Sequence, residues 1–305
     1  NKFKNEIVKT LISKDKLLPY GINDLGGARA VFGTDIEPTD IIKHNFAEII
    51  VEEIANEKML NDSLDFSAEF DKKLQEFLSN LEDKKLPKGA FLANLENEIQ
   101  KILNKSGYIQ SANDFLGNAQ TIKTEMAKTY GANVKSLFDK SERFKFFSEY
   151  AENQITKDGL KNAVIKKIAD KIRVASFSDY DIDSIKALVR GTSDVLPRYV
   201  NQVSVDTLSQ IHGALQSEIQ IKYKPKKGRW IGSEIETTRP FCKHMKTLSN
   251  PISYETLQLT LDKYCPDGKP KPLIGSGMIE GTNIENFTIN RGGYNCGHLW
   301  VWIID

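Results

Sequence analysis

Residues 196–223, LPRYVNQVSVDTLSQIHGALQSEIQIKY, are the stretch that decides the fold class of this chain. Apolar side chains recur in it with the spacing of one face of an α-helix. They are Leu196, Val200, Val203, Leu208, Ile211, Leu215 and Ile219. Ser193 and Asp194 precede the stretch as a helix cap, and Pro197 falls in the first turn, where its missing N–H costs nothing. The pattern predicts one long helix over residues 194–223.

Toward the N-terminus, residues 1–190 repeat the same helical period and predict a helical body. The predicted helices run from Phe3 to Leu18, from Ile41 to Ile54, from Phe66 to Leu81, from Phe91 to Leu103 and from Leu160 to Ile172. Residues 34–40 supply a cap for the second of these helices. Between Ser111 and Asp139 apolar residues are sparser, and Asn, Thr and Gly are more frequent, which predicts loops and short helices.

Beyond the long helix the sequence changes character. A basic run, Lys222–Trp230, interrupts the helical period, and the residues after it are rich in proline and glycine. One helical pattern covers Tyr254–Tyr264, whereas residues 287–289 and 299–303 are β-branched or aromatic and predict strands. We therefore expect a mainly α N-terminal body with a small α+β C-terminal module.

The size of the chain allows one large domain or two ordinary ones. Its 305 residues, of which 40% are apolar, are enough to bury a hydrophobic core. We expect a helical body over residues 1–190 and a C-terminal module over residues 191–305. That module would consist of the long helix, 194–223, and a Cys/His-containing α+β end, 228–305.

Charge and cysteine content limit the classes of function. Lysine and arginine number 42 against 41 acidic residues, so the chain lacks the strong basic field of a nucleic-acid coat. Any DNA contact must be local, as at the basic run 222–229, which is otherwise a solvated linker. The odd set of cysteines, Cys242, Cys265 and Cys296, argues against a secreted disulfide scaffold and for assembly in a cytoplasm. No apolar run is long enough to predict a membrane span.

Cysteine and histidine recur together in two motifs near the C-terminus. They are WIGSEIETTRPFCKH, residues 230–244, and NRGGYNCGH, residues 290–298. One interpretation is a tetrahedral zinc site, because thiolate and imidazole are ligands that zinc prefers. Its ligands would be Cys242, His244, Cys296 and His298. The spacing argues against this site, since paired zinc ligands are usually separated by two to four residues and each pair here by only one.

Two other interpretations of the cysteines remain open. Cys242 and Cys296 can be small buried residues of a β-rich core, with Arg239 and Arg291 donating hydrogen bonds to carbonyls or carboxylates around them. The two cysteines can also be joined by a disulfide, which a reducing cytoplasm disfavours. Cys265 lies in a predicted loop and is expected to be a bystander.

The remaining polar motifs predict structural roles. Gly292 and Gly293, which precede Tyr294, predict a tight turn with positive φ. A phosphate-binding role would need a following helix with Lys and Ser or Thr, which the sequence lacks. His44 and His212 lie on predicted helices without neighbouring ligand residues, so we expect ordinary structural or surface histidines. Since the sequence contains no nucleophile elbow, Walker loop or paired-His zinc helix, we do not expect an enzyme.

The order of these features resembles the C-terminal end of Mu F-like minor head proteins of tailed bacteriophages. In that family a long helix leads into an aromatic-containing strand and a Thr/Arg-containing approach to a Cys, and about fifty residues later a Gly- or Pro-rich turn ends in a Cys/His cluster. The residues that carry the resemblance are Trp230, Thr238, Arg239, Pro240, Cys242, Arg291, Gly292, Gly293, Tyr294, Cys296 and His298. This chain departs from the family pattern at Gly297, where many members have a basic residue, and at His244, where many have a second Cys.

The resemblance implies a structural minor head protein of the virion, assembled in the host cytoplasm and present in few copies near the portal vertex. Its partners would be the portal or other head proteins, with a local contact to viral DNA as an open alternative. It would act in head assembly or DNA delivery. The rival interpretations are another virion ring, adaptor or ejected cargo protein, and a metal-dependent nuclease or toxin-type enzyme.

Overall fold

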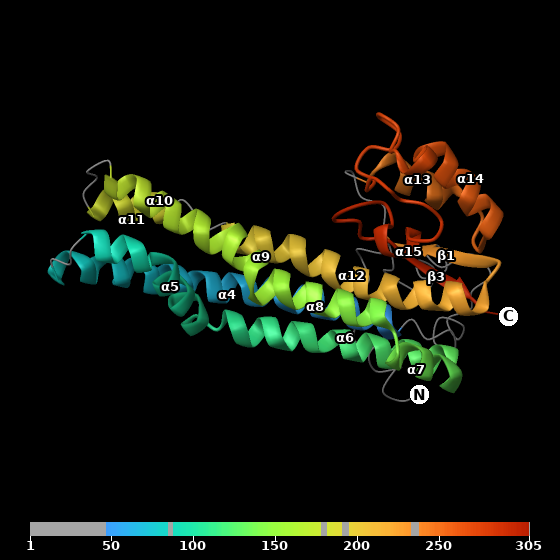
Figure 1. The fold of residues 1–305 in the computed structure, drawn as a ribbon, viewed down its shortest axis with the longest axis horizontal. Coiled ribbons are helices and arrows are strands. Elements are labelled where there is room, and N and C mark those ends of the chain that lie inside the picture. The colour runs from blue at the N-terminus through green and yellow to red at the C-terminus, as the bar shows by residue number, and fades with distance from the viewer. Residues whose placement is uncertain (1–46, 85–87, 178–181, 191–194, 233–237, 305) are drawn as a thin grey trace, which may run out of the picture. The chain divides into compact units, whose positions relative to one another are not determined.

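The computed structural model describes residues 47–84, 88–177, 182–190, 195–232 and 238–304 (Figure 1). Some predicted features lie outside these residues. They are the helix from Phe3 to Leu18, the start of the helix predicted from Ile41, the caps at residues 34–40 and 193–194, and His44.

Over the described residues the chain is mainly helical, with one small antiparallel sheet near the C-terminus, which confirms the predicted fold class. The helices are α4 (Ala47–Lys84), α5 (Lys88–Lys105), α6 (Tyr108–Tyr130), α7 (Ala132–Asp139), α8 (Glu142–Thr156), α9 (Asp158–Leu160), α10 (Lys166–Phe177), α11 (Ile182–Arg190), α12 (Val195–Tyr223), α13 (Pro240–Thr247), α14 (Tyr254–Tyr264) and α15 (Phe287–Asn290), with a π-helical turn η2 (Lys161–Ile165) and a 3-10 turn η3 (Pro266–Gly268). The strands are β1 (Lys227–Ile231), β2 (Ile252–Ser253) and β3 (Leu299–Ile303). None of the described helices combines the length and the apolarity that a membrane crossing requires.

Two helical predictions need correction. The helices predicted separately before residue 54 and after residue 66 belong to one helix, α4, because the segment between them contains no proline or glycine that would break it. The loops predicted between Ser111 and Asp139 are wrong as far as Tyr130, since α6 runs to that residue without a break. Beyond Gly131 the segment forms α7, a short helix of the kind that was also predicted there. The buried stripe of α6 is built partly from alanines, which the search for large apolar residues passed over; it consists of Ala112, Phe115, Ala119, Ile122 and Met126.

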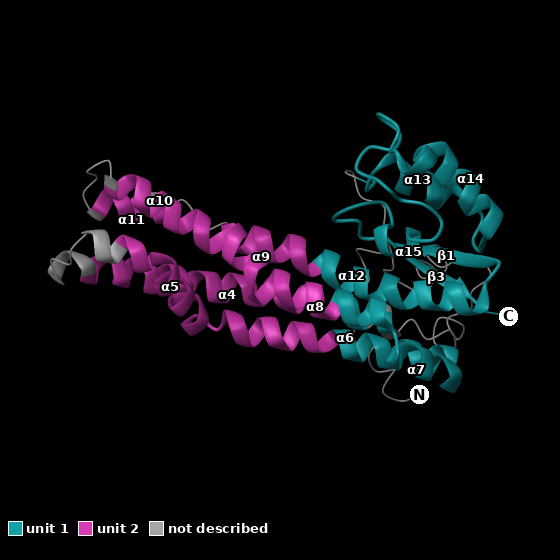
Figure 2. Ribbon diagram, in the orientation of Figure 1, with its two compact units in different colours: residues 1–52, 119–147, 205–305 teal, residues 53–118, 148–204 magenta. Residues whose placement is uncertain are grey.

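The chain divides into two compact units (Figure 2). Unit 1 comprises residues 1–52, 119–147 and 205–305, and unit 2 comprises residues 53–118 and 148–204. Unit 2 is helical in its described part. Its core includes Phe66 and Tyr108, whose rings meet edge to face at 5.1 Å, and the Tyr108 hydroxyl donates to the Ile155 carbonyl at 2.6 Å. Arg173 of α10 pairs with Glu96 of α5 at 3.0 Å.

Unit 1 contains a three-stranded antiparallel sheet in the order β2-β1-β3. Trp230 of β1 lies opposite Trp300 of β3, and Gly228 lies opposite Trp302. Gly228 makes room for an aromatic side chain, because a Cβ atom there would lie 2.4 Å from the Trp300 ring. The strand predicted over residues 299–303 is confirmed as β3. Its two tryptophans, Trp300 and Trp302, are both buried.

The strand predicted over residues 287–289 is wrong, because these residues form the short helix α15. The backbone N–H groups of Ile289 and Asn290 both donate to the Asn286 carbonyl at 3.0 Å, so the segment satisfies its hydrogen bonds locally. Its backbone also lies against α12, since a Cβ atom at Gly213 would be 2.2 Å from the Thr288 carbonyl oxygen. The segment is therefore a short helix that packs on α12 and not an extended strand.

Candidate functional site

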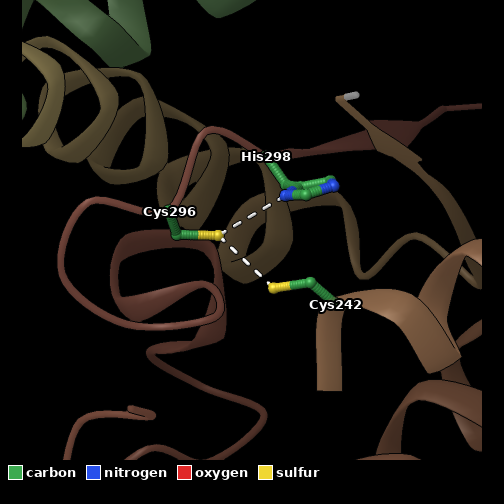
Figure 3. A group of neighbouring side chains, drawn as sticks. All are labelled: Cys242, Cys296 and His298. Atoms are coloured by element: carbon green, nitrogen blue, oxygen red, sulfur yellow. Dashed lines mark hydrogen bonds between the residues drawn. The ribbon is translucent and has the colours of Figure 1, made fainter. Parts of the chain in front are cut away.

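The two Cys/His motifs meet in the interior of unit 1 (Figure 3). The Sγ atoms of Cys242 and Cys296 are 3.7 Å apart, and Cys296 Sγ lies 3.8 Å from Nδ1 of His298. All three atoms lie within 4.8 Å of one another, and all three residues are buried. Side chains separated by 54 residues in the chain therefore converge on one small cluster, which we call the Cys2His cluster.

Helix α13 places Cys242 in the Cys2His cluster and directs His244 elsewhere. The helix begins at Pro240, and its residues Phe241, Cys242 and Met245 are buried. Residues two apart on a helix do not face the same side. His244 accordingly stacks its ring on Tyr264, with the ring centroids 5.2 Å apart. The structure brings together three of the four residues predicted as zinc ligands, and His244 is not among them.

The turn before Cys296 lies close to both sulfur atoms. A Cβ atom on Gly292 would lie 2.4 Å from Cys242 Sγ and 3.0 Å from Cys296 Sγ, so only glycine fits there without displacing a sulfur. The positive φ predicted for the glycine pair occurs at Gly293, at 108°, and also at Arg291, at 50°. The Cys296 N–H donates to the Gly293 carbonyl at 3.2 Å and closes the turn.

Two arginines hold the backbone of this turn, as predicted from the sequence. Arg239 donates to the Gly292 carbonyl at 2.8 Å and also to the Tyr294 carbonyl. Arg291 is buried and donates to the carbonyls of Cys296 and His298, the latter at 3.5 Å. The main-chain oxygens of two cluster residues are thus fixed by one guanidinium group.

Asp206 of α12 completes this network and was missed by the sequence analysis. Its Oδ1 lies 3.5 Å from the Arg291 guanidinium and accepts the Asn295 N–H at 2.7 Å. Burial raises the pKa of the Asp206 carboxyl, while the charge of Arg291 opposes this rise. Asp206 is the only Asp, Glu, Lys or Arg between Arg198 and Glu218 on the predicted helix, which was the available signal, although the sequence could not identify its partner.

The His298 ring is buried, and the ring of Trp230 covers one of its faces. Trp230 stacks on His298 with an interplanar angle of 5° and ring centroids 5.2 Å apart, and Phe287 stacks on the same tryptophan at 5.5 Å. A Cβ atom at Gly232 would lie 2.6 Å from His298 Cδ2, so the ring is also held by backbone. Among the described residues, His298 Nε2 has no hydrogen-bond partner. Packing, not a hydrogen bond from Nε2, orients this imidazole.

The family motif residues thus have distinct places. Cys242, Cys296 and His298 form the Cys2His cluster. Arg239, Arg291 and Gly292 lie around it, and Trp230 stacks on its histidine. Neither Thr238 nor Pro240 is buried: Thr238 precedes α13, and Pro240 is its first residue. The exposed Tyr294 accepts a hydrogen bond from Arg239 through its carbonyl. Cys265 is buried outside the cluster.

The two thiols have opposite acid–base properties. The Cys242 thiol, hydrogen-bonded to Cys296, has a raised pKa, and the same bond lowers the pKa of Cys296. Burial opposes the lowering at Cys296, whereas His298 and the positive charge of Arg291 assist it. Of the two thiols, Cys296 therefore loses its proton more readily than Cys242. Such a pair can bind a soft metal ion, share a proton or, with an oxidant, form a disulfide.

A scan against models of protein families, and searches of curated proteins and of solved structures, found no match to this chain.

Proposed function

We propose that this chain is a structural minor head protein of a tailed-phage virion that acts near the portal vertex in head assembly or DNA delivery. The observation that supports the proposal is the convergence of two separated motifs on one cluster. The residues that resemble the Mu F-like pattern are remote in sequence, yet Cys242, Cys296 and His298 meet in one buried group. The order of the elements also agrees, since α12 leads into the tryptophan-containing strand β1 and then into α13.

A structural role suits the surroundings of the cluster. Its three side chains are between 2% and 4% exposed, and Trp230 and Phe241 are fully buried beside them. A substrate could reach the sulfurs only if this aromatic shell opened, which disfavours the nuclease or toxin-type alternative. The near-neutral net charge of +1 fits a protein whose partners are other proteins, such as the portal, with any DNA contact confined to a local basic segment.

The proposal is tested by the location of the protein during phage production. Particles made from the genome that encodes this chain are purified on a density gradient and digested for quantitative mass spectrometry, with the major capsid protein as the internal standard. We expect the chain in mature heads at a few copies per particle, and cross-linked to portal subunits in assembling heads. The matched control is a non-structural phage protein of similar abundance in the lysate. Absence from both mature and assembling heads would contradict the proposal.

The rival functions give different outcomes in the same experiments. A packaged or ejected cargo protein would be lost from particles triggered to release DNA, whereas a head protein near the portal would stay with the empty head. A nuclease would cleave DNA in the presence of Mg²⁺, Mn²⁺ or Zn²⁺. We expect no cleavage by the purified chain.

A further inference from the structure

We infer that Cys242, Cys296 and His298 bind one Zn²⁺ through two Sγ atoms and Nδ1. The spacing of these atoms fits a tetrahedral ion. Zinc–sulfur bonds of about 2.3 Å at a tetrahedral angle place two sulfurs about 3.8 Å apart, and zinc–nitrogen bonds of about 2.0 Å give sulfur–nitrogen distances of about 3.5 Å. The observed separations are 3.7 Å between the sulfurs and 3.8 Å between Cys296 Sγ and His298 Nδ1, and the ligand atoms of Cys242 and His298 lie within 4.8 Å of each other.

The donor set selects the class of metal. Two thiolates and one neutral imidazole are soft to borderline ligands, which favour Zn²⁺ or Cu⁺ over Mg²⁺ or Ca²⁺. Zinc binds the thiolate form of cysteine, so any protons held by Cys242 and Cys296 leave to solvent as the ion binds. Two thiolates would then neutralise the charge of the ion, so the buried site carries little net charge apart from Arg291.

The surroundings hold these ligands in place without the ion. Arg291 fixes the carbonyls of Cys296 and His298, and Trp230 fixes the plane of the His298 ring. The absence of a side chain at Gly292 lets the turn approach both sulfurs. Groups around the first ligands commonly set both their orientation and their metal affinity. The three ligand side chains are therefore preorganised to bind a small ion.

Three protein ligands leave the fourth tetrahedral position to a water molecule. His244 cannot supply it, because its ring stacks on Tyr264 on another side of α13. The role we assign to the ion is still structural, since it would link α13 to a turn 54 residues later in the chain. A link of this kind restricts the unfolded chain and stabilises the folded one.

A disulfide between the same cysteines is a distinct outcome. A disulfide bond is about 2.05 Å long, so the two sulfurs would have to approach by more than ~1.5 Å. The step would also remove two electrons and whatever protons the thiols hold, and it would need an oxidant such as peroxide or another disulfide to accept the electrons. Bound zinc would protect both thiolates from this reaction.

The test uses the full chain, purified without a polyhistidine tag in a reducing, anaerobic buffer. Zinc is measured by elemental mass spectrometry and expressed per chain. Variants of the proposed ligands are Cys242→Ser, Cys296→Ser and His298→Gln. The matched controls are Cys265→Ser, at a buried cysteine outside the cluster, and His244→Gln, at a histidine beside it. We expect about one zinc per chain in the parent and in both controls, and little or no zinc in each ligand variant.

A second measurement does not depend on whether the variants fold. Co²⁺ is added to the metal-free parent chain, and the absorbance is recorded. A tetrahedral site with two thiolates should give sulfur-to-cobalt charge-transfer absorption that saturates at one equivalent and disappears when Zn²⁺ is added. A parent chain that contains no zinc and gives no such absorption overturns the inference. Zinc loss in the His244→Gln or Cys265→Ser control, but not in the cluster variants, would also overturn it.

Discussion

Arg291 carries a positive charge into the interior of unit 1. Its side chain is buried, and its guanidinium contacts two carbonyls and the Asp206 carboxylate. Removing a charge from water is costly unless hydrogen bonds and an opposite charge compensate for the loss of solvent. Asp206 is itself buried, so each of the two groups depends on the other.

Arg291→Met is expected to lower the unfolding free energy of unit 1 by about 3–5 kcal/mol, because it leaves the Asp206 charge buried and unpaired. Trp230, Trp300 and Trp302 are the only tryptophans in the chain, so tryptophan fluorescence in urea reports on this unit. Combining Arg291→Met with Asp206→Asn should restore part of the loss. The control, Arg143→Met, breaks a pair with Glu218 in which the arginine is half-exposed, and should cost about 1 kcal/mol or less. Equal effects at the two arginines would contradict the prediction.

His212 is a buried group that the cluster does not use. Its side chain is fully buried, and neither ring nitrogen has a hydrogen-bond partner among the described residues. Burial, assisted by the charge of Arg291, lowers the pKa of His212 to about 3. In the unfolded chain this histidine takes up a proton near its ordinary pKa of about 6.5, whereas in the folded chain it stays neutral until about pH 3.

The stability of unit 1 should therefore fall as the pH decreases from about 6.5 toward 3, with His212 contributing about 1.4 kcal/mol per pH unit. In His212→Leu the slope of unfolding free energy against pH should be smaller by about one proton, because the leucine cannot take up a proton on unfolding. Urea denaturation at several pH values measures this slope. The control His244→Gln removes a less buried histidine and should change the slope less. An unchanged slope in His212→Leu would show that His212 takes up its proton in the folded chain.

At the scale of an element, the contact between α12 and α15 depends on one glycine. A Cβ atom at Gly213 would lie 2.2 Å from the Thr288 carbonyl oxygen, which belongs to the backbone and cannot rotate away. Gly117 in α6 is exposed, and a Cβ atom added there would have no neighbouring atom within 4 Å. The two helical glycines therefore form a matched pair in which only one is required by packing.

Gly213→Ala should destabilise unit 1 by about 1–3 kcal/mol, since the clash exceeds the gain of about 1 kcal/mol in helix propensity. Gly117→Ala should stabilise its helix by about 0.5–1 kcal/mol, because nothing opposes that gain. Thermal unfolding followed by circular dichroism and tryptophan fluorescence compares the two variants. An increase in stability in both would mean that α12 and α15 do not approach closely in solution.

Strand β3 is an edge strand whose outer side is covered by side chains. The Trp302 N–H donates to Gln216 Oε1 at 3.0 Å, and the Trp302 carbonyl accepts from the Tyr130 hydroxyl at 2.7 Å. An unpaired strand edge invites association with other chains, so this cover also protects the monomer.

Gln216→Leu should cost about 1–3 kcal/mol of unfolding free energy, because it leaves the buried Trp302 N–H without an acceptor. Gln258→Leu is the control in the same unit, as its side chain bonds only the exposed Asp262, and it should change stability by about 0.5 kcal/mol or less. Urea unfolding monitored by fluorescence measures both. Light scattering should also detect aggregation in Gln216→Leu alone. Equal stability of the two variants would argue against the bond to Trp302.

The sequence predicts those parts of the fold that depend on interactions between residues close together in the chain. The long helix and strand β3 were predicted, because their apolar patterns are continuous and local. Helix α6 was missed, since alanines form much of its stripe, and α15 was mistaken for a strand, since its conformation depends on Asn286 and on α12. Short apolar segments do not distinguish strand from helix without such contacts.

The sequence predicted that cysteines and histidines of the two motifs form the candidate site, but not which of them meet or which other residues support them. The sequence could identify Cys242, Cys296 and His298, because cysteine and histidine recur together in the two motifs. The exclusion of His244 required the helical conformation of residues 240–247, which places it on another face from Cys242. Asp206 could not be linked to Arg291 because the two lie 85 residues apart in the chain. Both results depend on tertiary contacts that no local pattern records.

At the scale of the whole molecule, the Cys2His cluster belongs to unit 1, whereas α5 and α10 lie within unit 2. Chelation of the inferred zinc should therefore increase amide hydrogen exchange in α13 and in residues 290–304, because the metal links these segments. Peptides from α5 and α10 serve as the internal control and should exchange at unchanged rates. Hydrogen exchange with mass spectrometry measures all of them in one sample. A Cys242→Ser variant should show the faster exchange before chelation and no further change after it. If zinc is removed without faster exchange at residues 290–304, the ion does not stabilise this part of the fold.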